Sequence, residues 1–200
     1  MKSNTRSRLA RTDWRYVDKD SLDDFDAADW HRLNSQRALY MADEQSRQAL
    51  RLLTASRDDS TFGYAVNNYR HCLQSATLVM EAGLDEETIV VALLHDIGFI
   101  ACPDSHGEFA AALLGAYISE ANLWMLRHHA AFQNHHVHDC PGIDRDARER
   151  WREHEHFQWT AEFVERYDQG AICAAFTTAP IEAFEPMVQR LFARTPRRRK

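Results

Sequence analysis

The chain has 200 residues, of which 44% are hydrophobic, and its formal net charge at pH 7 is −6. This composition excludes a disordered chain, and seven Gly and five Pro residues are too few for the many turns of a β-sandwich or barrel. An acidic domain with one short basic end is also a poor candidate for binding nucleic acid.

No segment is apolar over the length that a bilayer requires, and the basic N-terminus lacks the hydrophobic core of a secretory signal. The four cysteines are scattered, without the spacing of a zinc ribbon or a redox pair. We therefore expect a cytoplasmic protein with free thiols and no membrane partner.

The pattern of charge and hydrophobicity predicts an N-terminal arm over residues 1–29, one helical domain over 30–193 and a solvated basic tail over 194–200. Gly83 is expected to end a helix and Asp85 to begin the next one. Strand-like alternation is absent, so the predicted class is all-α. Helical periodicity predicts helices over residues 30–53, 67–81, 86–100, 106–114, 120–132, 145–167 and 186–193.

The adjacent residues His95 and Asp96 stand in a segment that is otherwise apolar on nearly every side. Burying a carboxylate costs several kcal/mol unless something compensates its charge, and a metal ion is the strongest compensation available. The alternative is a hydrogen-bonded core histidine beside an ordinary buried aspartate.

Other predicted helices each carry a further candidate ligand: His71, His106, His128 or His129, and Asp168. Helices of a bundle project such side chains into a shared interior. Neutral imidazole and carboxylate suit iron, manganese or zinc, whereas the lack of a cysteine ligand argues against a structural zinc site.

In this order the candidates resemble the H…HD…H…H…D pattern of the HD-domain superfamily. The segments HCLQSATLVMEAG and ALLHDIG are similar to the mixed-valent di-iron HD oxygenases, such as myo-inositol oxygenase and the oxygenases of hydroxylated aminoethylphosphonates. The resemblance covers roughly residues 60 to 170. It implies a helical bundle with an Fe(II)/Fe(III) pair in its interior; manganese or another divalent metal is the alternative.

The resemblance also implies a role for each ligand. His71, His95 and Asp168 would hold one metal, and Asp96, which has two oxygens, would bridge to the second. The second metal would be held by His106 together with His128 or His129. We prefer His128 because it aligns better with the family, which would leave His129 to support a ligand from behind or to face the substrate.

Three residues depart from the phosphonate-cleaving relatives, which have charged or basic side chains where this chain has Tyr64, Phe99 and Phe132. A phosphate or phosphonate needs several charge-assisted contacts, so these departures argue against such a substrate. The remaining candidates for substrate binding are neutral or aromatic: Tyr64, Asn67, Gln74, His129, Phe132 and Gln133.

We therefore expect a di-iron oxygenase that hydroxylates or oxidatively cleaves a small hydroxylated organic substrate with O2. The alternative is a metal-dependent phosphohydrolase, for which Arg70, Arg127 and Arg166 are the available anion partners. A binding protein with a vestigial site is a third interpretation, disfavoured because all six ligands are present. The loop histidines His135, His136 and His138 could form a surface metal site or a lid, but solvated loop residues are the favoured interpretation.

Overall fold

The structure, a computed structural model, describes residue 11 and residues 13–197. The outermost residues of the expected arm (1–10 and 12) and of the expected tail (198–200) lie outside the described residues. Within the described part every regular element is helical, which confirms the all-α prediction. None of these helices combines the length and the hydropathy that crossing a membrane requires.

The chain forms two compact units, Met1–Gln45 and Ser46–Lys200. Helix α1 (Ala27–Ala55) begins in the first unit and ends in the second, so the division falls inside the expected domain 30–193. In the first unit the segment before α1 is held to that helix. The Lys19 ammonium lies 2.5 Å from buried Asp29, and the Gln36 amide exchanges two hydrogen bonds with the main chain of Arg15.

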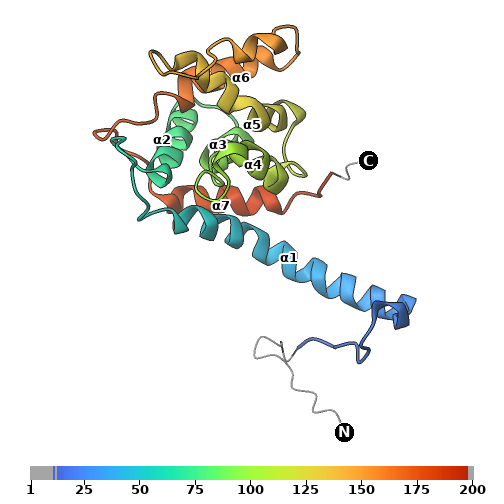
Figure 1. Ribbon diagram of the computed structural model, residues 1–200. Coiled ribbons are helices and arrows are strands. Elements are labelled where there is room, and N and C mark those ends of the chain that lie inside the picture. Colours follow the sequence, from blue (N-terminus) through green and yellow to red (C-terminus); the bar gives the residue numbers. More distant parts are fainter. Residues whose placement is uncertain (1–10, 12, 198–200) are drawn as a thin grey trace. The chain divides into compact units, whose positions relative to one another are not determined.

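The second unit is built around helix α3 (Glu86–Leu94), which contacts α2, α5 and α7 (Figure 1). Every residue from Thr88 to Leu94 is buried, as expected for a helix that is apolar on nearly all sides. The helices around it are α2 (Asn68–Glu81), α4 (His106–Leu114), α5 (Glu120–Gln133), α6 (Phe157–Phe163) and α7 (Ile181–Phe192). Short helical turns complete the unit: η2 (Pro103–Ser105), η3 (Asn134–His136), η4 (Ala147–Trp151) and the π-helical turn η5 (Val164–Asp168), while η1 (Leu22–Asp24) lies in the first unit.

Local signals fix the ends of α2 and α3 as the sequence predicts. The Asp85 carboxylate accepts a hydrogen bond of 2.8 Å from the Thr88 N–H and so caps α3. Gly83 follows α2 with a φ of +72°, a left-handed conformation that glycine adopts without steric cost. These signals fix the ends of the helices that carry His71 and that precede His95 and Asp96.

Helices α4 and α5 approach each other closely at Gly107. A Cβ atom at this position would overlap the main-chain carbonyl of Leu126 in α5. Glycine is therefore required for this approach, which brings His106, at the start of α4, beside His129 of α5.

Two predicted helices are wrong in their extent. The helix predicted over 86–100 ends at Leu94, and tight turns follow, because Gly98 packs against Phe109 and favours a helix poorly. The helix predicted over 145–167 is broken into η4, irregular turns, α6 and η5. Trp151 and His154 pack on Trp124 of α5, and these tertiary contacts override the periodicity.

The C-terminal region also differs from the prediction. Helix α7 starts five residues before Pro186, which cannot donate a helical hydrogen bond; the burial of one face from Ile181 to Phe192 offsets that loss. The tail is not frayed as far as Arg197. Arg194 lies 2.6 Å from the Glu87 carboxylate, and Arg197 lies 3.0 Å from that of Glu120.

Candidate metal centre

Six candidate ligands meet inside the second unit, delivered by five different turns or helices, and each is less than one tenth exposed. They form two groups whose ligand atoms lie within 4.8 Å of one another: His71, His95 and Asp168; and His95, Asp96 and His129. His106 adjoins the second group. The six are His71 of α2, His95 and Asp96 after α3, His106 of α4, His129 of α5 and Asp168 of η5.

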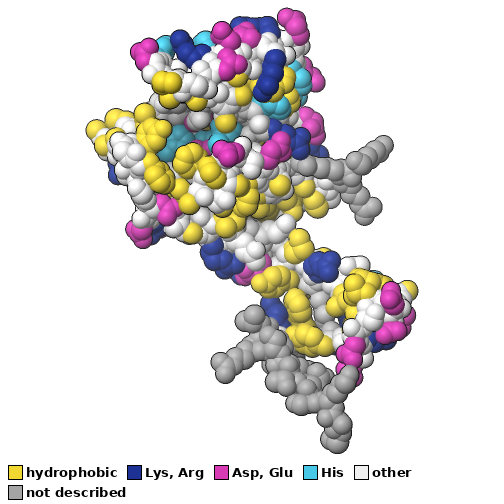
Figure 2. Space-filling view, viewed as in Figure 1, with side chains coloured by type: hydrophobic (Ala, Val, Ile, Leu, Met, Phe, Trp, Pro, Cys, Tyr) yellow, Lys and Arg dark blue, Asp and Glu magenta, His cyan; other side chains and the backbone are white. Residues whose placement is uncertain are grey.

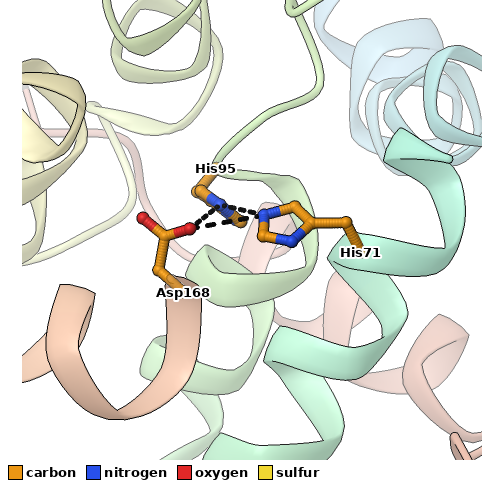
Figure 3. Close-up of side chains that lie close together, drawn as sticks. All are labelled: His71, His95 and Asp168. Carbon is orange, nitrogen blue, oxygen red and sulfur yellow. Dashed lines mark hydrogen bonds and ion pairs between the residues drawn. The ribbon is translucent and has the colours of Figure 1, made fainter. Parts of the chain in front are cut away.

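The first group is shown in Figure 3, in which the two imidazoles and the carboxylate point toward one another. The Nε2 atoms of His71 and His95 are 3.1 Å apart. Oδ1 of Asp168 lies 3.4 Å from Nε2 of His71 and 3.5 Å from Nε2 of His95. Two ligand atoms each about 2.1 Å from one ion are about 3.0 Å apart at a right angle and about 3.4 Å apart at the tetrahedral angle. These separations are therefore those of atoms that share one cation.

The second group is as tight. The Nε2 atoms of His106 and His129 are 3.0 Å apart, and Oδ1 of Asp96 lies 3.2 Å from the first and 3.1 Å from the second. The other oxygen of Asp96, Oδ2, lies 3.6 Å from Nε2 of His71 in the first group. Asp96 thus presents Oδ1 to His106 and His129 and Oδ2 to His71, while Oδ1 is also 3.7 Å from Nε2 of His95. This arrangement suits a carboxylate that bridges two cations.

All four clustered imidazoles use Nδ1 in the same way. Nδ1 of His71, His95, His106 and His129 lies 2.7 to 3.0 Å from the main-chain carbonyl of Ala171, Ala92, Pro103 and Leu126, respectively. A carbonyl only accepts, so Nδ1 carries the proton, and a neutral ring then directs a bare Nε2 lone pair into the cluster. Lone pairs facing one another at 3.0 Å repel unless a proton or a cation lies between them, and carbonyl-oriented imidazoles are the usual arrangement around metals.

The Asp168 carboxylate provides further evidence that the cluster fits a cation. Its Oδ1 accepts a hydrogen bond of 2.7 Å from the Gln133 amide, whereas its buried Oδ2 has no hydrogen-bond partner. An unpartnered buried carboxylate oxygen carries a desolvation cost of several kcal/mol. A bound cation would offset that cost.

The electrostatics of the cluster lead to the same conclusion. Burial lowers the pKa of His71, but the hydrogen bond to Asp168 and the charge of Asp96 outweigh it and raise that pKa from 6.5 to about 9. Burial raises the pKa values of Asp96 and Asp168, yet the surrounding imidazoles hold both well below 3.8. The pKa of His95 is raised despite burial, because Asp96 and Asp168 favour its charged form. Without a metal, the two ionised carboxylates retain protons on the nearby imidazoles, and a cation would replace those protons.

The structure brings His129, rather than the preferred His128, into the cluster. His129 is fully buried with Nε2 in the cluster, whereas His128 stacks on the ring of Trp124, with 4.0 Å between ring centroids, and its Nδ1 lies 2.7 Å from the Trp124 carbonyl. Adjacent residues of a helix point about 100° apart, so only one of the two can face the centre. The nearby histidines His154 and His156 belong to the same aromatic surface cluster.

A cavity of about 500 Å³ reaches the centre from the surface. Its wall includes His71, Asp96 and Asp168, and Figure 2 shows histidine side chains recessed among hydrophobic ones on the surface of the second unit. Of the candidate substrate-binding residues, Tyr64, Asn67 and Gln133 line it. Phe99 also lines the cavity and packs on the His106 ring.

The other candidate substrate-binding residues have different positions. The buried Gln74 amide exchanges hydrogen bonds of 2.6 and 3.0 Å with the main chain of Cys173, and fully buried Phe132 packs among Trp124, Trp151 and Phe157. His129 lies in the metal cluster itself. Asn67, although it lines the cavity, uses its amide to cap α2 and to bind the main chain of Arg57.

The three candidate anion-binding arginines are engaged away from the cavity. Arg70 donates to the carbonyls of Ala174 and Phe176, Arg127 pairs with Glu108, and Arg166 pairs with Glu162. None of them, and no other described lysine or arginine, belongs to the cavity wall.

Many residues of the cavity wall were not among the candidates for substrate binding. They include His136 and His138, which were expected to be solvated loop residues, and Asn68, whose amide donates to the Asp96 carbonyl. Phe62 and Ile172 are two further examples. For the loop of His136 and His138, three histidines within four residues were the only signal in the sequence, and no sequence pattern predicts that the loop lies over the site.

Comparison of the chain with models of protein families and with curated proteins finds no match.

Proposed function

We propose that this chain is a di-iron oxygenase that uses O2 to hydroxylate or oxidatively cleave a small hydroxylated organic substrate. The metal part of the proposal rests on the convergence of four carbonyl-oriented imidazoles on two buried carboxylates. Imidazole and carboxylate without thiolate suit iron and manganese. The order of these ligands along the chain, with His129 as the fifth, resembles the dinuclear HD-domain oxygenases.

The wall of the cavity supports an oxygenase over a phosphohydrolase. A phosphoryl substrate requires several positive contacts beyond the metal ions, and no described lysine or arginine lines this cavity. With His129 as the ligand, the residue four positions later is Gln133, which also lacks the positive charge of the phosphonate-cleaving relatives. A neutral hydroxylated substrate fits this wall better than an anion does.

Two bound iron ions would supply electrons to O2 and a coordination position for a substrate hydroxyl. The chain's own contribution is orientation. The carbonyls of Ala171 and Ala92 fix the rings of His71 and His95, and Gln133 fixes Asp168. The cavity wall includes His71, Asp96 and Asp168, whereas His106 does not belong to it and packs against the ring of Phe99. The substrate is therefore expected to bind at the ion held by His71, His95 and Asp168.

The proposal is tested by electron paramagnetic resonance on protein loaded anaerobically with iron and then partly oxidised. We expect about two iron ions per chain and a coupled half-integer-spin signal from an Fe(II)/Fe(III) pair. Asp96→Asn keeps the size of the side chain but removes one bridging oxygen, so the coupled signal should disappear in that variant. Two irons without a coupled signal, together with manganese-dependent hydrolysis of phosphoesters, would favour the phosphohydrolase.

A further inference from the structure

Three large apolar side chains belong to the exposed part of the cavity wall. Phe62, Tyr64 and Ile172 line the cavity, although 66%, 62% and 45% of their respective surfaces are exposed. The polar residues Ser60, Thr61, His138 and Gln169 share this exposed part. Phe62 and Tyr64 come from the loop between α1 and α2, and Ile172 comes from the segment after η5. Two segments more than one hundred residues apart thus bring three large apolar side chains to one rim.

The inner end has the opposite character. The cavity residues of the metal centre, His71, Asp96 and Asp168, are 8%, 6% and 0% exposed. The cavity therefore runs from a buried polar end to an exposed mouth whose large side chains are apolar. The wall also includes His136, whose buried Nε2 has no hydrogen-bond partner in the described structure.

Single exposed apolar residues are ordinary, but their grouping around the mouth of a cavity is typical of a binding site. Phe62 adds a second observation, because its φ of +52° places a bulky residue in the left-handed region. That conformation costs about 1–2 kcal/mol, and such outliers concentrate at functional sites. Core packing does not account for it, since most of the Phe62 surface is exposed.

We propose that the substrate is amphiphilic: a hydroxyl-bearing head binds at the metal centre, and an alkyl or aryl tail lies along Phe62, Tyr64 and Ile172. This inference rests on the proposed function, because the head is placed at the proposed metal ions. The cavity volume of about 500 Å³ is in the range that encloses a whole drug-sized molecule, so it has room for more than a head group. The apolar rim then supplies affinity that a small polyol could not use.

A series of straight-chain hydroxamic acids tests the tail. The hydroxamate group chelates metal ions, and acetyl, butanoyl, hexanoyl and octanoyl members differ only in tail length. Isothermal titration of Mn(II)-loaded protein should show a dissociation constant that falls with each added methylene, up to about fourfold where the methylene is fully buried. The fall should stop when the tail extends beyond the rim.

Matched variants locate the tail. Ile172→Ser and Phe62→Ser should flatten the dependence on chain length and leave the affinity for acetohydroxamate unchanged. Ile100→Ser is the control, because Ile100 is 46% exposed, almost the same as Ile172, but does not line the cavity. The control should keep the full dependence on chain length.

The outcomes separate the two proposals. If acetohydroxamate binds the metal-loaded protein but longer chains bind no better, the tail inference is overturned and the metal centre stands. Equal flattening by Ile100→Ser and Ile172→Ser would also overturn it. If the protein holds no metal, or acetohydroxamate does not bind the loaded protein, the proposed function fails and the inference fails with it.

Discussion

The neighbours His128 and His129 provide a matched pair of substitutions with opposite expected effects. His129→Ala removes an imidazole whose Nε2 lies 3.0 Å from His106 and 3.1 Å from Asp96, so one of two metal positions loses a ligand. His128→Ala removes a ring stacked on Trp124 outside the cluster. The first should lower metal content from about two ions per chain to about one. The second should leave it unchanged.

The expected stabilities also differ. An aromatic pair is worth about 0.5–1.5 kcal/mol beyond its buried area, and 1 kcal/mol shifts Tm by about 2–4 °C in a chain of this size. His128→Ala should therefore lower Tm by about 1–6 °C with or without metal. Free metal at one hundred times its dissociation constant stabilises a site by about 2.7 kcal/mol. The metal-dependent rise in Tm should be smaller in His129→Ala than in the wild type.

The assay is elemental analysis after dialysis against metal-free buffer, combined with calorimetry of the metal-free and loaded forms. If His128→Ala loses an ion while His129→Ala keeps two, the assignment of the fifth ligand is refuted. Equal loss in both variants would indicate general disruption of α5 rather than removal of a ligand.

Three further predictions follow from the geometry. Because the pKa of His71 is raised to about 9, its protonation stabilises the metal-free fold fully below pH 6.5, and this stabilisation is lost as pH rises through about 9. Calorimetry should show the Tm of the metal-free protein falling over that window while metal affinity rises. A Tm that does not change with pH would contradict this prediction. Gln74→Met removes the two hydrogen bonds to Cys173 that hold the segment carrying the Ala171 carbonyl. Titration should therefore show about 10–100-fold weaker binding of the metal held by His71, His95 and Asp168. Thr77→Val is the control, because it removes only the hydrogen bond to the Ala179 N–H farther along the chain, and it should retain the affinity. Gly107→Ala forces α4 and α5 apart against the Leu126 carbonyl, and denaturant unfolding should show a loss of about 1–3 kcal/mol; unchanged stability would refute the close approach.

Much of the fold could be predicted from the sequence because its signals are local. The caps at Asp85 and Gly83 and the apolar run of α3 predict helices from residues that are close together in the sequence. The break between η4 and α6 could not be predicted, because it results from Trp151 and His154 packing on α5, which is distant in sequence.

In the candidate site, too, some features could be predicted from the sequence and others depend on how the helices pack. Five of the six clustered residues follow from their order along the chain, because separate helices of a bundle each deliver one side chain to the interior. The choice between His128 and His129 could not be made from order, since it depends on the rotation of α5 about its axis. The Gly107 contact with Leu126 sets the approach of α4 and α5, and spacing alone does not contain that information.

Anomalous X-ray diffraction at the iron edge, on crystals grown from the iron-loaded protein, would show whether the six buried side chains form one dinuclear metal centre. We expect two peaks, one among His71, His95 and Asp168 and one beside His106 and His129, with Asp96 between them. A single peak, or a peak at the loop histidines with none in this cluster, would contradict this expectation.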